Sequence, residues 1–148
     1  MQTADLDTVV GLMQELIIQD PLPDRLPFDA LRARSALQGL IRDSPYGRVS
    51  LICDANTIVG YLVLTFGYSL EFHGRDAFID ELYIRATHRG RGWGLRAMAH
   101  AESVARSENV RAIHLEVGRE NTALEFYRRI GYVSHERYLM TKWIAAGN

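Results

Sequence analysis

Apolar side chains recur every three or four positions over residues 4–19, a spacing that is typical of an amphipathic helix with one buried face. Thr3 stands just before this stretch, where its hydroxyl could cap the first turn. Prolines interrupt the pattern over residues 20–27 and indicate a stiff loop. The helical spacing returns over residues 28–43, so the first part of the chain predicts two helices.

The pattern then changes to that of strands. Residues 48–53 and 58–68 are rich in Val, Ile, Leu, Tyr and Phe, and a short polar turn between them predicts an antiparallel hairpin. Helical and strand-like stretches alternate in the rest of the chain. They predict a strand at 76–84, a helix at 95–108, a strand at 111–117, a helix at 121–130 that ends at Gly131, and one or two strands within 132–143.

This order of elements predicts an α/β fold, in which a mixed central sheet is flanked by helices. A chain of 148 residues is large enough for one core, so we expect a single domain over residues 1–148. Apolar residues make up 47% of the chain, an ordinary share for a globular protein. Basic and acidic side chains number 17 and 18, whereas a protein that binds nucleic acid usually carries a basic surplus.

Two further classes of protein are disfavoured. No apolar stretch approaches the roughly eighteen residues that a membrane span needs, and the N-terminus lacks the pattern of a secretory signal. We therefore expect a cytoplasmic protein that does not enter the membrane. Cys53 is the only cysteine, which excludes an intrachain disulfide and a cysteine-based zinc site, and we expect no bound metal.

A glycine-rich segment between the predicted strand 76–84 and the following helix is the strongest candidate for a binding site. The unsatisfied N–H groups of a helix N-terminus favour an anion, glycines let a ligand approach the backbone, and arginines bind phosphate. The spacing matches neither a dinucleotide-binding turn nor a P-loop, because position 95 is Leu and no Lys lies nearby. The segment consists of Arg89, Gly90, Arg91, Gly92, Trp93 and Gly94.

This segment reads R-x-x-G-x-G from Arg89 to Gly94 and resembles the pyrophosphate loop of the GNAT superfamily of acetyl-CoA-dependent N-acetyltransferases. A second stretch, from Asn121 to Tyr132, resembles the family signature N-x-x-A-x-x-x-Y-x-x-x-G-[FY], except that one residue and not two separates Asn121 from Ala123. The two motifs lie about thirty residues apart, and the resemblance extends from about Thr57 to Lys142. It implies the GNAT fold.

The chain departs from that family at its start. GNAT proteins usually begin with a strand before the first helix, but only two residues precede Thr3 here, so either the first family strand is missing or the sequence is truncated at its start. The strand that it would have paired with then presents an open edge. A second copy of the chain could cover that edge, and we expect a homodimer.

The resemblance also implies roles for residues around the loop. Acetyl-CoA would be the co-substrate, and the strand 76–84 would carry a β-bulge that frees backbone groups for the pantetheine arm. Asn121 would cap its helix and hydrogen-bond the same arm, and Tyr127 would be the general acid for the departing CoA thiolate. The freed backbone groups would belong to Leu82, Tyr83 and Ile84, one of whose N–H groups would polarise the thioester carbonyl.

Asp80 and Glu81 interrupt the apolar strand and are candidates for the general base. An amine with a pKa near 10 is only about a thousandth neutral at pH 7, so a carboxylate that accepts its proton would accelerate transfer. Asp80 alternates with Phe78 and Leu82, which predicts an apolar environment for its carboxylate. Glu81 could instead be turned inward by the bulge. His114 on the next strand is a rival base, and either acid could simply pair with a basic side chain.

These features predict an N-acetyltransferase in which a bound primary amine attacks acetyl-CoA directly. A covalent acyl-cysteine is disfavoured because Cys53 lies far in sequence from the loop. The alternatives are a non-catalytic acyl-CoA sensor, which a turnover assay would distinguish, and a nucleotide-binding regulator. Acidic residues favour a small cationic amine as acceptor: Glu71, Asp76, Asp80 and Glu81, with weaker support from Asp20, Asp24 and Asp29.

Overall fold

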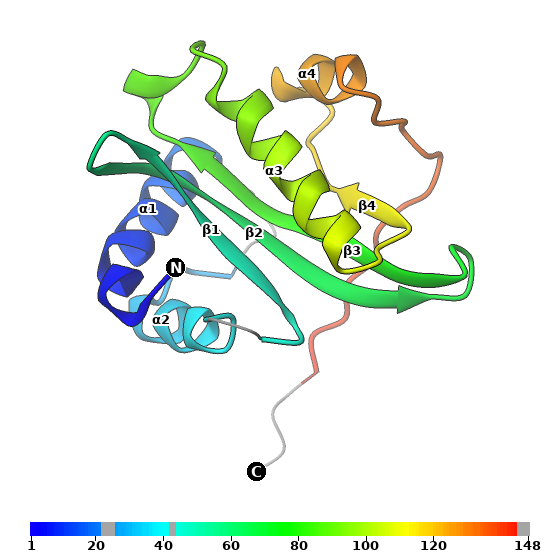
Figure 1. The fold of residues 1–148 in the computed structure, drawn as a ribbon, viewed down its shortest axis with the longest axis horizontal. Helices are drawn as coiled ribbons and strands as arrows, with labels where there is room; N and C mark the ends of the chain where they lie inside the picture. The colour runs from blue at the N-terminus through cyan, green and yellow to red at the C-terminus, as the bar shows by residue number, and fades with distance from the viewer. Residues whose placement is uncertain (22–25, 42–43, 145–148) are drawn as a thin grey trace. The chain divides into compact units, whose positions relative to one another are not determined.

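The computed structural model describes residues 1–21, 26–41 and 44–144. They fall into two compact units, Met1–Glu116 and Val117–Asn148, each of which is described by itself. The second unit contains α4 (Ala123–Arg129). The first unit contains the sheet and the remaining helices (Figure 1).

A four-stranded sheet forms the centre of the first unit. Antiparallel pairing joins β1 to β2 and β2 to β3, whereas β3 and β4 are parallel, so the sheet is mixed as predicted. The predicted hairpin and the α/β class are both confirmed. The strands lie side by side in the order β1 (Gly47–Asp54), β2 (Thr57–Ser69), β3 (Gly74–Ile84) and β4 (Ala112–Leu115).

Helices cover both faces of this sheet (Figure 1). On the face that we call the α1 face, α1 (Leu6–Gln19) and α2 (Ala30–Gln38) bury apolar side chains against Tyr61, Val63 and Tyr83. On the opposite α3 face, α3 (Trp93–Ser107) packs Ala97 against the β1–β2 hairpin. None of the helices in the described ranges has the length and apolar character that a membrane crossing requires.

The first helix begins later than its predicted start. Thr3 does not cap it but lies in a short 3-10 turn, Thr3–Asp5, that precedes α1. The reason is a local hydrogen bond in which the backbone N–H of Gln2 donates to the Asp5 carboxylate at 2.7 Å. No strand precedes α1 in the described residues, and the Met1 amino group lies 3.5 Å from a carbonyl oxygen of β1.

α2 is shorter than the predicted helix at residues 28–43. The Asp29 carboxylate accepts hydrogen bonds from the N–H groups of Leu31 and Arg32, at 2.9 and 3.1 Å, and so caps the helix at Ala30. Part of the predicted remainder, residues 42–43, lies outside the described residues, as do residues 22–25 of the predicted loop.

Most later elements match their predictions within a few residues. β3 and α3 begin slightly early, β4 is shorter than predicted, and Gly131 follows α4 with a φ of 97°, as expected for the residue that ends a helix. The strands predicted within 132–143 are wrong for the described residues, which contain none there. A strand needs a neighbour to accept its hydrogen bonds, and large apolar side chains of this segment, such as Tyr138, are exposed instead.

Candidate active site

A bulge in β3 organises the candidate site. In the antiparallel ladder Val63 pairs with Glu81 and Leu64 pairs with Ile79, so β3 contains one extra residue at this point, Asp80. The bulge implied by the family resemblance is therefore confirmed. A bulge bends the strand and interrupts regular pairing, which is why bulges are frequent next to active sites.

The bulge also changes which face each side chain takes. Glu81 pairs with Val63 and therefore shares the α1 face, whereas Leu82 pairs with Leu62 and takes the α3 face. Phe78 and Leu82 thus lie on opposite faces, and the predicted alternation of Asp80 between them is wrong. Asp80 is exposed rather than set among apolar side chains, because a bulged residue stands outside the regular packing of the sheet.

Glu81 is the more enclosed of the two candidate bases. Its side chain is half-buried, and the Tyr61 hydroxyl donates a hydrogen bond of 2.7 Å to Oε2. Tyr61 itself is fully buried beneath α1. The bulge thus brings the Glu81 carboxylate onto the α1 face and holds it there, while the adjacent Asp80 remains accessible to solvent.

β3 continues beyond its parallel partner. The ladder with β4 ends at the Ile79–Leu115 pair, five residues before β3 ends at Ile84. Tyr83 is buried on the α1 face, and Leu82 and Ile84 pack on the α3 face, so their side chains belong to the core as predicted. Within the described residues, the β4-facing edge of this last part of β3 is outside the ladder, where backbone groups could bind a ligand.

The glycine loop follows directly. A single 3-10 turn, Ala86–His88, leads into it, and Gly92 is the residue that precedes α3. Gly90 and Gly92 have φ values of 73° and 79°, which side chains rarely adopt, and a Cβ at either would meet no atom within 4 Å. The loop therefore needs glycine for its conformation, and the space in front of both residues is open at the N-terminus of a 15-residue helix.

Arg89, predicted to bind the ligand, is already anchored within the protein. Its Nε donates to the Ile84 carbonyl oxygen at 2.8 Å and its Nη2 donates to Gln19 Oε1 at 2.6 Å. Its guanidinium also lies 5.7 Å from the centre of the Tyr83 ring. The loop is thus tied both to the end of β3 and to the end of α1.

The polar residues at the end of α1 form a cluster that the sequence did not reveal. We call it the α1 clamp: Glu15, Gln19, Tyr83, Arg85 and Arg89. Arg85 Nη2 donates to Glu15 Oε1 at 2.9 Å, and the Tyr83 hydroxyl donates to Glu15 Oε2 at 3.0 Å. The pKa of Glu15 is lowered chiefly by the hydrogen bonds from Arg85, which stabilise the carboxylate. The pKa of Tyr83 is raised, first by burial and then by its contact with Glu15.

Trp93 of the loop packs on the α3 face. Arg96 donates to the Arg91 carbonyl oxygen at 3.4 Å and stacks over the Trp93 ring at 4.1 Å. Arg96 was not among the predicted residues, although its position one turn after Trp93 was a signal for this contact. Gly94 lies in the first turn of α3.

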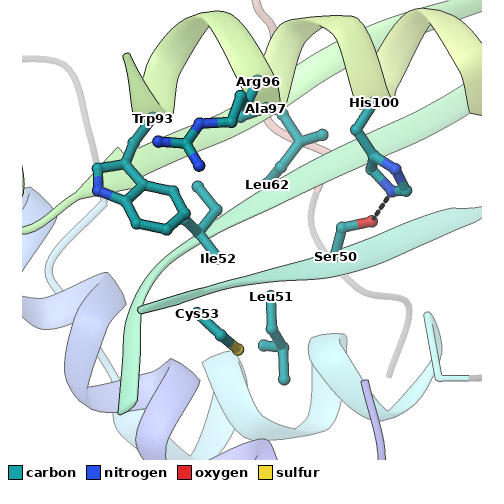
Figure 2. Close-up of a pocket in the computed structure, with 9 residues that line it drawn as sticks. All are labelled: Ser50, Leu51, Ile52, Cys53, Leu62, Trp93, Arg96, Ala97 and His100. Atoms are coloured by element: carbon teal, nitrogen blue, oxygen red, sulfur yellow. Dashed lines mark hydrogen bonds between the residues drawn. The ribbon is translucent and has the colours of Figure 1, made fainter. Parts of the chain in front are cut away.

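A pocket of about 330 Å³ lies between α3 and the β1–β2 hairpin. Figure 2 shows the side chains that line it. Ser50 Oγ and His100 Nε2 meet at one end of it at 2.9 Å, and Trp93 and Arg96 line the other. Trp93 is the one predicted ligand-binding residue among its lining side chains. Cys53 also lines the pocket and is exposed.

His114, the rival base, lies on β4 in register with Phe78. Its Nε2 is 3.8 Å from Asp76 Oδ2, too long for a hydrogen bond, and its ring is 4.8 Å from that of Phe72. His114 is thus placed beside an acid and an aromatic ring, on the strand next to the bulge. No group of three His, Cys, Asp or Glu within the described ranges is arranged to hold a metal ion.

The two residues predicted from the second motif belong to the second unit. Asn121 Oδ1 accepts a hydrogen bond from the Ala123 N–H at 2.9 Å, so its side chain satisfies the first N–H of α4 as predicted, although the residue at the N-cap position is Thr122. Tyr127 has the rings of Phe126 and Tyr132 as neighbours, at 5.3 and 5.9 Å. Burial raises the pKa of the Tyr127 phenol, which therefore keeps its proton at neutral pH.

Comparison with known proteins identifies the same family. The profile of the acetyltransferase (GNAT) family matches residues 12–132. An uncharacterized N-acetyltransferase of Methanocaldococcus jannaschii is 30% identical over 96 residues, which are 63% of this chain and 42% of that protein. The chain thus spans about two fifths of the length of this curated relative.

Solved structures share the fold of this chain. An integron cassette protein from the mobile metagenome of Cole Harbour salt marsh has a TM-score of 0.84 and 27% identity, over 99% of this chain and 90% of that one. A predicted acetyltransferase from Clostridium acetobutylicum, solved with acetyl-CoA, has a TM-score of 0.78 at 16% identity, over 96% and 92% of the two chains. The second likeness concerns the fold alone. With its bulged strand, its glycine loop and the match over most of its length, the chain belongs to the GNAT family of acetyltransferases.

Proposed function

We propose that the protein is an acetyl-CoA-dependent N-acetyltransferase whose acceptor is a small cationic primary amine. The observation that carries this proposal is the bulge at Asp80, which lies on the strand that leads into the glycine loop. β3 thereby offers acidic side chains for an acceptor and an open backbone edge for a thioester arm. The loop after it leads into the N-terminus of α3, which would bind phosphate.

The residues present fit acetyl-CoA as co-substrate. The pyrophosphate would lie on the N–H groups at the start of α3, where Gly90 and Gly92 leave open space, with Arg89 and Arg91 as cationic donors. Trp93 and Gly94 complete this pyrophosphate loop. The backbone of Leu82, Tyr83 and Ile84 would hold the pantetheine arm, and Asn121 of the second motif would hydrogen-bond the same arm. The acetyl-CoA present in the structure from Clostridium acetobutylicum supports this choice.

The chemistry would proceed by direct attack. Asp80 or Glu81 accepts a proton from the ammonium group of the acceptor, and the free amine attacks the thioester carbonyl carbon. A backbone N–H at the bulge stabilises the negative oxygen. The C–N bond forms, the C–S bond breaks, and Tyr127 gives its proton to the thiolate that leaves. The nitrogen, which still carries one proton more than an amide, releases that proton to the Tyr127 phenolate or to solvent. The amine bears the acetyl group, and free CoA is the second product.

The preference for a cationic acceptor rests on the acids along β3. Asp76, Asp80 and Glu81 all belong to this strand, and Glu71 lies in the turn before it. Of the weaker candidates, Asp29 is engaged in capping α2, Asp20 follows α1, and Asp24 lies outside the described residues. A cationic amine would find complementary charge at the bulge.

The decisive experiment is a turnover assay with a panel of amines that differ in charge. Release of the CoA thiol would be followed over time, with diamines and polyamines, amino acids, aminoglycosides and neutral amines at equal concentration, and with a reaction that lacks amine as the blank. We expect the highest kcat/KM for a cationic small amine. Binding of acetyl-CoA without turnover for any amine would favour the sensor function instead.

A further inference from the structure

The direction of the hydrogen bonds in the α1 clamp carries an inference that rests on the proposed function. Arg85 and the Tyr83 hydroxyl both donate to the Glu15 carboxylate. Because the Tyr83 hydroxyl already donates its single proton to Glu15, its oxygen can only accept a further hydrogen bond. Gln19 Nε2 donates that bond at 2.9 Å. The Gln19 amide is therefore held with Oε1 turned toward the loop, where it accepts the bond from Arg89.

We propose that Gln19 is a positioning residue that orients the Arg89 guanidinium for the pyrophosphate of acetyl-CoA. An arginine side chain has five N–H donors in a rigid plane. The bonds to Ile84 and Gln19 use one donor on Nε and one on Nη2, which leaves three donors for an anion. Arg89 is exposed, so an anion can approach its guanidinium although two of the donors are already bonded.

We expect the Gln19 contact to raise the affinity for acetyl-CoA, because the long Arg89 side chain is already fixed and loses little conformational freedom on binding. Removing the Gln19 contact should weaken acetyl-CoA binding roughly 2- to 10-fold, the size associated with immobilising one such side chain. The same contact joins the glycine loop to α1, so a helix on one face of the sheet would set the affinity at the loop.

The test is a double-mutant cycle read by calorimetry with acetyl-CoA. The variants are Gln19→Leu, Arg89→Ala and the pair, each checked for its thermal unfolding temperature. Gln14→Leu is the matched control, since it makes the same change at an exposed Gln on the same helix. We expect Gln19→Leu to raise the Kd, Gln14→Leu to leave it unchanged, and Gln19→Leu to have no further effect once Arg89 is Ala.

Steady-state kinetics give a second measurement. A positioning role raises the KM for acetyl-CoA and leaves kcat at saturation unchanged. An unaltered Kd in Gln19→Leu, or an equal loss in the Arg89→Ala background, would overturn the role of Gln19 while acetyl-CoA binding by the wild type stands. If the wild type itself did not bind acetyl-CoA, the proposed function would fail first, and this inference would fall with it.

Discussion

Tyr127 is the residue whose removal should separate chemistry from binding. Burial raises the pKa of its phenol, so the proton needed by the leaving thiolate is retained through neutral and mildly alkaline pH. We predict that Tyr127→Phe lowers kcat by roughly 10²- to 10⁴-fold, as expected for a lost general acid, with little change in the Kd for acetyl-CoA. Steady-state kinetics and calorimetry measure the two quantities.

The matched control is Tyr132→Phe, which removes a hydroxyl from the ring next to Tyr127, at a position where the family signature accepts either residue. Its kcat should stay near that of the wild type. A loss below about threefold in Tyr127→Phe would assign the proton to water or another donor, and the ring would then have only a packing role.

The two acids of the bulge can be told apart by their dependence on pH. We predict that Asp80→Asn abolishes transfer near neutral pH and regains part of it at high pH, where the amine loses its proton without help. In the wild type the rate should rise from about pH 6 to 9 for the same reason. Profiles of kcat/KM against pH for one competent amine provide the measurement.

Glu81→Gln is the comparison for this prediction. It keeps a side chain of the same size that could still meet the Tyr61 hydroxyl, so a loss of activity would come from the charge and not from packing. If Glu81→Gln were the more damaging change, the roles of the two acids would be exchanged. Wild-type kcat/KM in both variants would direct attention to His114.

Gly92 tests the loop itself. Its φ of 79° makes any side chain costly, so Gly92→Ala should lower stability by roughly 1–2 kcal/mol and should also crowd the phosphate position. Gly131→Ala is the control, because Gly131 also has a positive φ, 97°, and open space for a Cβ. We predict similar losses in thermal stability, but a Kd for acetyl-CoA raised tenfold or more in Gly92→Ala alone. Equal Kd values would refute the phosphate position.

At the scale of elements, the attachment of α1 to β3 should depend on pH. The folded chain lowers the pKa of Glu15, so the stability from the clamp is present above its ordinary value of 4.5 and is lost as the pH falls through the lowered value. Both partners of the Glu15–Arg85 pair are more than a third exposed, with 38% and 37% of their side-chain surface accessible, so the contribution is about 0.5–1 kcal/mol.

Denaturant unfolding of the wild type and Glu15→Gln at pH 7 and pH 3 measures this contribution. The wild type should be the more stable protein at pH 7, and the difference should shrink at pH 3. The alkaline side has the opposite sign, since the raised pKa of Tyr83 gives stability below pH 10 that is lost above it. Tyr83→Phe should lack the alkaline loss. A difference that is independent of pH would show that Glu15 acts through packing alone.

For the whole molecule, local patterns predict the elements better than their contacts. The hairpin, β3, the glycine loop and α3 follow from short-range periodicity and turn chemistry, which the nearest residues determine. The α1 clamp joins residues 64 to 70 positions apart, and no periodicity encodes such a pair. The strands expected near the C-terminus depend in the same way on a neighbouring strand.

The candidate site shows the same limit at closer range. The sequence identifies the two acids because they are charges in an apolar strand. It does not predict which face of the sheet each side chain takes, since strict alternation holds only in a regular ladder. One extra residue at Asp80 placed Glu81 and Leu82 on faces opposite to those that counting from Phe78 would give. Bulges depend on the pairing of two strands, and one strand read alone does not reveal them.

Because Asp80 is the extra residue of the bulge, the bend of β3 and the charge at position 80 can be changed separately. Ile79 and Glu81 would alternate normally if Asp80 were deleted, so every other side chain of β3 could keep its present face while the strand straightened. A substitution at this position, by contrast, removes the carboxylate and keeps the extra length of chain. Deleting Asp80 and neutralising it are therefore two independent changes. The deletion alters the curvature of β3, and the substitution alters the proton affinity at position 80.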